Sequence, residues 1–143
     1  MFSSLSLSAL GRLQSVQNAA ARLLSRSSKW SHITPILKTL HWLPVAYRIR
    51  FKILTLTYRA LHGQTPAYVA DLIHPYTSSR PLRSHRQHLL SVPRTHLKTR
   101  GDRAFAAVAP KLWNALPLHL RSADSVDSFK NVLKTFLFGQ AFG

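Results

Sequence analysis

Acidic residues, which hold the metal ions of many polymerases and nucleases, are scarce in this chain of 143 residues. It has four, and all are aspartates: Asp71, Asp102, Asp124 and Asp127. Two-metal catalysis needs carboxylates clustered so that they hold two divalent ions about 4 Å apart. Asp124 and Asp127 stand at a predicted helix start, where a carboxylate caps the helix and stabilises its dipole. We therefore expect no polymerase or nuclease centre of this type.

Other catalytic and metal-binding patterns are also weak. The eight histidines include His85 and His88, which lie three residues apart in a predicted loop, with no third ligand nearby. Cysteine is absent, so thiolate zinc sites and disulfides are excluded. The five glycines form no phosphate-cradling loop, and no serine stands in a nucleophile elbow. These patterns favour a binding module that is not an enzyme and takes no cofactor, metal or small-molecule substrate.

Basic residues dominate the charge of the chain. Twenty Lys and Arg residues give a formal net charge of +16, whereas a small domain usually carries a net charge of magnitude about 2–8. Arginine is the more frequent of the two, and its planar fork pairs two phosphate oxygens at once. RNA or DNA is therefore the expected partner, ahead of an anionic membrane surface. The alternative is a crowded basic surface that a larger assembly neutralises. No apolar run approaches the roughly 18 residues of a membrane span, and we expect no membrane partner.

The candidate nucleic-acid contacts fall into two groups. One forms a line on a predicted helix, with Thr55 in the same line: Arg48, Lys52 and Arg59. The other lies in a turn-rich basic stretch: Arg80, Arg83, Arg86, Arg94, Lys98, Arg100 and Arg103. The helical line could equally be a solvated face without a ligand. Trp30 or Tyr76 could stack on bases, whereas the apolar surroundings of Trp42 and Trp113 predict core anchors.

Hydrophobic periodicity and capping signals predict the helices that position these residues. Apolar residues at three- and four-residue spacing predict an amphipathic helix over 8–24. Thr-Pro pairs at 34–35 and 65–66 predict N-caps of short helices that end near residues 40 and 73. The strongest helix is expected over 44–61, with a broad apolar face and a stop at Gly63. Pro110 is expected to interrupt a helical stretch around Trp113, and Asp124 or Ser125 to cap the last helix.

These elements predict a mainly α fold: a small helical domain with a long irregular basic connection and, as an option, a short β-hairpin near residues 89–98. Residues 1–74 form the first helical segment, in which residues 1–9 could be disordered. Residues 75–103 form the basic connection, where Pro93 favours a sheet edge or a break. Residues 104–143 form a C-terminal helical segment that packs on the first.

A series of short motifs gives the chain a family resemblance. They occur in a fixed order over about 125 of the 143 residues: LQSVQNAAARLL at 13–24, HITP at 32–35, HWLPV at 41–45, LHG at 61–63, PAY at 66–68, HPY at 74–76, VPRT at 92–95, KTRGDRAF at 98–105, APKLWN at 109–114, LP at 116–117, FK at 129–130, LK at 133–134 and LF at 137–138. In this order and over this length, the motifs resemble the region downstream of the palm in reverse transcriptases of non-LTR (LINE-type) retrotransposons.

The resemblance implies a C-terminal piece of such a polyprotein, without its endonuclease and without the metal-binding aspartates of the palm. It implies a nucleic-acid-binding fragment whose partners are RNA, DNA and the parent reverse transcriptase core, in the nucleus or the cytoplasm. One alternative is a structural packing domain, or the orphaned product of a truncated element, with no independent activity. Another is a mitochondrial RNA-binding protein, since residues 1–70 contain no acid. Against import, the basic bias continues past any plausible cleavage point.

Overall fold

The computed structural model describes residues 6–77, 88–94 and 104–143. In these ranges the chain forms α1 Leu7–Leu24, α2 Ile33–Thr39, α3 Val45–Leu61, α4 Ala67–Ala70, α5 Phe105–Asn114, α6 Leu118–Arg121 and α7 Val126–Phe142. The predicted mainly α fold is confirmed. Ser6 caps α1 by accepting from the N–H of Ala9, so residues 7–9, predicted as part of a disordered end, are helical.

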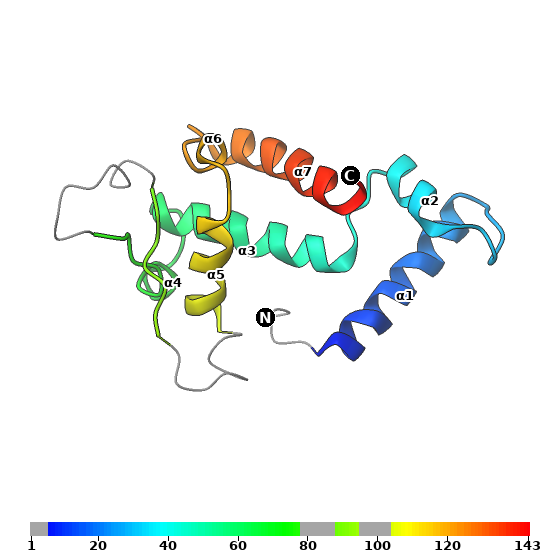
Figure 1. Cartoon of the computed structure of the whole chain (residues 1–143), viewed down its shortest axis with the longest axis horizontal. Coiled ribbons are helices and arrows are strands. Elements are labelled where there is room, and N and C mark those ends of the chain that lie inside the picture. The colour runs from blue at the N-terminus through cyan, green and yellow to red at the C-terminus, as the bar shows by residue number, and fades with distance from the viewer. Residues whose placement is uncertain (1–5, 78–87, 95–103) are drawn as a thin grey trace.

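Helix α3 is the centre of the fold, and α7 and α5 pack against it (Figure 1). Its predicted start and stop are both confirmed: Pro44 is the N-cap, and Gly63 takes φ +65° two residues after the last helical residue. Positive φ suits glycine because a Cβ would be strained there. The apolar face of α3 enters one core together with side chains from other helices and from the segment around Leu90. Members of this core include Ile53, Leu54, Tyr58, Val69, Leu90, Phe105, Trp113, Leu120, Phe129, Leu133 and Leu137.

Helix α7 begins at one of the two caps that the sequence predicts. The Ser125 side chain accepts from the N–H of Ser128, 3.2 Å away, which identifies Ser125, and not Asp124, as the N-cap. Phe129, Leu133 and Leu137 recur every four residues and are at most 2% exposed. Four-residue spacing keeps side chains on one helix face, so this face anchors α7 along α3.

Two capping predictions and one helix break were wrong. Helix α2 begins after His32 rather than at Thr34, and α4 begins after Pro66, with no side-chain cap on either. Helix α5 continues through Pro110, where the sequence predicted an interruption. A proline in a helix interior costs about 3 kcal/mol. Pro110 is itself fully buried, and packing of this helix face in the core offsets that cost.

Helix α1 has the predicted boundaries, but its apolar stripe is not the face that packs against the fold. Val16 is 69% exposed and Leu23 is 80% exposed. The buried side is polar and small, because Gln17 and Ala21 lie there. Gln14 Oε1 accepts from the N–H of Val45 at 2.9 Å, and Gln17 Nε2 donates to the carbonyl of Leu43 at 2.8 Å. Polar pairing with the start of α3 therefore decides which face of α1 turns inward.

The segment 88–91 lies between residues 74–76 and Asn114 of α5. Its one antiparallel bridge joins Leu90 to Pro75, and Asn114 holds Leu90 through two bonds of 2.8 Å to its backbone N–H and carbonyl. In the described part of the chain, the partner of this segment is therefore residue 75 and its neighbours. The second arm of the predicted hairpin, near Leu97, lies outside the described residues.

Candidate nucleic-acid interface

The predicted contact residues on α3 are all exposed, as their spacing requires: Arg48, Lys52 and Arg59. Arg94 is exposed too, at the end of the segment 88–94. The other six lie outside the described residues: Arg80, Arg83, Arg86, Lys98, Arg100 and Arg103. The candidate interface is therefore described from the three residues on α3, and Arg94 lies far from them in sequence.

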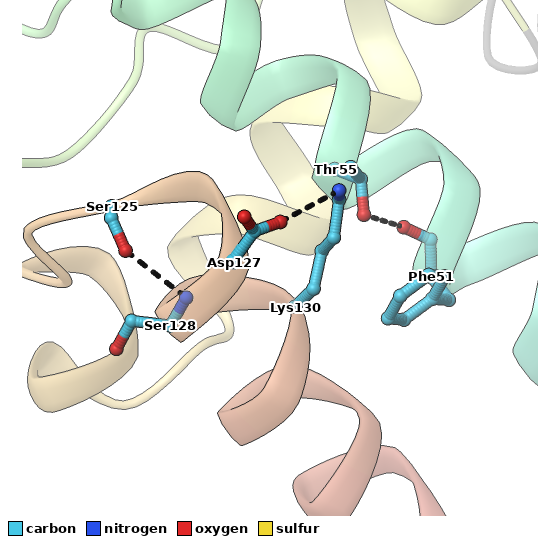
Figure 2. Close-up of polar contacts among 6 residues, drawn as sticks. All are labelled: Phe51, Thr55, Ser125, Asp127, Ser128 and Lys130. Carbon is cyan, nitrogen blue, oxygen red and sulfur yellow. Dashed lines mark hydrogen bonds and ion pairs between the residues drawn. The ribbon is translucent and has the colours of Figure 1, made fainter.

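The line of cations on α3 is interrupted at Thr55. This residue is only 9% exposed, and its hydroxyl donates to the carbonyl of Phe51 at 2.8 Å. Figure 2 shows Thr55 on α3 and Lys130 on α7, with Lys130 paired to Asp127 at 3.2 Å. The buried Thr55 separates Arg48 and Lys52 from Arg59, so the line predicted from spacing is not continuous.

A cleft of about 570 Å³ lies on the side of Arg48 and Lys52. Its lining comes from the turn before α3, from α3 itself and from α7: His41, Trp42, Leu43, Arg48, Phe51, Lys52 and Lys134. We call this the basic cleft. Its volume is within the range of about 300–1,000 Å³ that small-ligand sites usually occupy. Three cations, a histidine and two aromatic rings therefore meet at one hollow.

Local backbone geometry places each of these side chains. Arg48 and Lys52 are four residues apart, so they lie one above the other on α3. Lys134 follows Lys130 by four residues and therefore lies on the same face of α7 as Lys130. In the turn before α3, His41 takes φ 52°, and the N–H of Trp42 donates to the carbonyl of Leu37 at 2.9 Å. This turn carries both rings into the cleft.

The charge of the basic cleft is uncompensated by the described residues. No aspartate lines it, and Arg48, Lys52 and Lys134 have no ion-pair partner in the described ranges. Like charges four residues apart on a helix cost a few tenths of a kcal/mol, and an anion in the cleft would remove that cost. Phosphate groups, which accept charge-assisted hydrogen bonds from Arg and Lys, suit this arrangement.

The tryptophans divide between core and cleft. Trp113 is 1% exposed and its indole N–H donates to the carbonyl of His88 at 2.8 Å, which confirms it as a core anchor. Trp42 was predicted in the same role, but it is only partly buried and lines the basic cleft. Trp30 and Tyr76, the predicted stacking residues, are 82% and 45% exposed. An aromatic ring beside cations is an arrangement that single-stranded nucleic acid can use for stacking.

Sequence reasoning did not identify Lys134 as a candidate contact residue, although it lines the basic cleft. The available signal was its spacing of four from Lys130, but nothing in the sequence placed α7 against the cationic end of α3.

In the described ranges, no cluster of three or more potential ligands could hold a metal ion. None of the helices there is both long and apolar enough to cross a bilayer. No family model, curated protein or solved structure matches the chain.

Proposed function

We propose that this chain is a nucleic-acid-binding module that makes its phosphate contacts in the basic cleft. The observation that carries the proposal is the convergence of Arg48, Lys52 and Lys134 on one hollow without an acidic residue. Most protein–nucleic acid hydrogen bonds go to phosphate and sugar, and these contacts carry no sequence information. The expected binding is therefore sequence-tolerant and strongly dependent on salt.

The family resemblance supports the same function from an independent direction. A post-palm fragment of a LINE-type reverse transcriptase would help its parent enzyme to hold template RNA or target DNA. Within this proposal the chain has no catalytic role of its own, and its four aspartates supply no polymerase centre. Its partners are RNA or DNA and, where present, the parent reverse transcriptase core.

The test is fluorescence-anisotropy binding to an RNA hairpin and to a DNA duplex over a salt series. The triple variant R48Q/K52Q/K134Q removes the three cations of the basic cleft. If each makes one phosphate contact, the slope of log K against log salt becomes shallower by about 2.7 on B-DNA, or about 2.1 on single strands. Circular dichroism of each protein verifies that the helices are intact.

A matched variant separates the cleft from net charge alone. R12Q/K29Q/K38Q removes the same number of charges from exposed positions that do not line the basic cleft. We expect it to change the slope by clearly less than the cleft variant does. Equal changes in the two variants would mean that diffuse charge, and not this cleft, holds the nucleic acid. A folded wild-type chain that ignores both ligands would refute the function itself.

The exposed apolar stripe of α1 favours a second candidate, a packing domain for the parent reverse transcriptase. Val16, Leu23 and Leu24 are each at least 63% exposed. Monomeric soluble proteins rarely leave large apolar patches uncovered, and such patches mark interaction sites. The two candidates are compatible with each other if the stripe contacts protein while the basic cleft contacts nucleic acid.

A further inference from the structure

A second cleft lies at the opposite end of α3 from the basic cleft. Its volume is about 520 Å³, and it is formed by the end of α3, the segment 88–90 and the connection from α6 to α7. The walls are apolar except for a few side chains. Those polar or ionisable side chains are His62, His88, Arg121, Ser122 and Asp124. We call this the Arg121 cleft.

Arg121 is the unusual residue of this cleft. It is only 9% exposed, and its Nε and Nη1 are buried with no hydrogen-bond partner. It also has no ion pair with any residue in the described ranges. Burial accordingly lowers the pKa of the guanidinium. A buried charge without a partner is strongly unfavourable, and proteins usually pair such charges. The pairing anion is missing from this chain's described side chains.

The location of Arg121 is fixed by its neighbours rather than by a partner for its charge. Its helix, α6, inserts Leu120, which is fully buried, into the core. The backbone N–H of Arg121 bonds to the carbonyl of Pro117 at 3.4 Å. Because α6 is a single short turn that follows the core residue Leu116 and contains the core residue Leu120, Arg121 is held at the edge of the core. The fold therefore keeps a cation in this cleft.

The other polar side chains of the Arg121 cleft indicate which groups a ligand would carry besides its anionic group. Asp124 supplies only acceptors when ionised, so it suits hydroxyl or amino donors on a ligand. His62 Nδ1 lies 2.8 Å from the carbonyl of Tyr58 and must donate to it, which leaves Nε2 available. The ring of His62 stacks on Tyr58, with centroids 4.0 Å apart. The cleft thus offers one cation, one carboxylate, a histidine nitrogen and apolar walls.

We propose that the Arg121 cleft binds a phosphate monoester of nucleotide size, either a free mononucleotide or the phosphorylated end of a nucleic acid strand. Phosphate oxygens would meet the planar guanidinium fork, which pairs two oxygens at once. Hydroxyl groups of the sugar would donate to Asp124, and the base would lie against the apolar wall formed by Leu61 and Leu89. This site goes beyond the phosphate track of the basic cleft and does not depend on it.

The first experiment follows the thermal midpoint of the whole chain with increasing AMP. Adenosine, inorganic phosphate and glutamate serve as separate ligands. A ligand present at about 100 times its Kd raises the midpoint by roughly 9 °C in a domain of this size. We expect such a rise with AMP and little or none with adenosine or glutamate. A wild-type midpoint that millimolar AMP leaves unchanged, or that glutamate raises as much, would overturn the proposal.

The variant R121M tests the residue without leaving a buried charge. Replacement of a buried charged group by an apolar one of similar volume is often neutral or stabilising, so we expect this variant to fold and to lose the AMP response. R48Q/K52Q/K134Q should keep that response while its nucleic-acid salt dependence falls. If R48Q/K52Q/K134Q loses the AMP response and R121M keeps it, the ligand lies in the basic cleft, and this inference is refuted.

The two possible sources of the phosphate are separated with a short DNA strand. Binding of a 5′-phosphorylated oligonucleotide is compared with that of the same strand carrying a 5′-hydroxyl. If the cleft receives strand ends, the phosphorylated strand binds more tightly to wild type and equally with the other strand to R121M. If AMP stabilises the chain but the two strands bind wild type equally, the site takes a free nucleotide. If AMP leaves the thermal midpoint unchanged and the two strands bind wild type equally, the proposal is refuted, even if the basic cleft binds nucleic acid.

Discussion

Replacement of Trp113 by alanine tests whether the core is organised as described. Trp113 lies 1% exposed between α3 and α7. Its ring centroid is 5.8 Å from that of Phe129 and 6.4 Å from that of Tyr58. Its indole N–H also fixes the segment around His88. The residue therefore joins three parts of the chain, and its loss affects all of them.

The size of the effect follows from burial and hydrogen bonding. A tryptophan side chain buries roughly 200 Å², which at about 25 cal/mol per Å² corresponds to about 5 kcal/mol. Measured Trp-to-Ala substitutions in cores cost about 3–5 kcal/mol because the site relaxes in part. The lost bond to His88 is included in such measured values. We therefore expect W113A to lower the free energy of unfolding by about 4 kcal/mol.

Urea denaturation monitored by circular dichroism at the helix band measures this change. W113F is the intermediate variant: it retains an aromatic ring in the core but lacks the donor to His88, and we expect a cost of about 1–2 kcal/mol. W30A is the matched control, because Trp30 is 82% exposed and surface substitutions usually change stability by less than about 0.5 kcal/mol. A W113A protein within about 1 kcal/mol of wild type, or W30A as costly as W113A, would refute the packing described.

Two further predictions concern Tyr58 and α1. Burial of Tyr58 and, to a lesser extent, the charge of Asp124 raise the pKa of the Tyr58 phenol above 10.0. The stability that the protonated phenol contributes is therefore complete below the unfolded pKa and is lost as pH rises through the folded pKa. Because the phenol donates to the carbonyl of Ala123, wild type should have a higher unfolding free energy than Y58F at about pH 8. This difference should shrink above about pH 10, and a difference that stays constant with pH in urea titrations would contradict the prediction. In α1, V16Q/L23Q should change the unfolding free energy by less than about 1 kcal/mol in total, since both side chains are exposed. The isolated wild-type chain should associate through this stripe in sedimentation experiments, and the variant should not; equal self-association of the two proteins would exclude the stripe as the contact.

The elements that the sequence predicted best are those whose ends and faces depend on local signals. Helix α3 has a proline at its start and a glycine after its end, and α7 has a serine cap and a four-residue apolar repeat. Such features act within one or two turns of the chain. The face of α1 could not be read this way, because Gln14 and Gln17 find their partners some thirty residues away at the start of α3. Periodicity alone favours the leucine stripe.

The sites were predicted less completely than the helices. Spacing on α3 identified Arg48 and Lys52, but the basic cleft also needs Lys134, which comes to the same place only through the packing of α7 on α3. The burial of Thr55, which interrupts the predicted line, is likewise a property of the folded chain. Arg121 carried no signal at all, because an arginine after Leu-His-Leu looks like an ordinary helix end. Its lack of a partner is a property of the three-dimensional arrangement.

The way in which α1 is attached has a consequence for the motions of the chain. Two amide side chains, the guanidinium of Arg22 bonded to the carbonyl of Ser31, and a small buried patch around Ala21 connect it to the rest of the fold. Each hydrogen bond contributes a net of about 0.5–1.5 kcal/mol, so the two amide bonds of Gln14 and Gln17 alone favour the attached state by roughly five- to 150-fold. Sub-global opening of α1 should then be far more frequent than unfolding of the core. In its open state, a largely apolar helix with a basic end would be free to engage another molecule while α3, α5 and α7 stay folded.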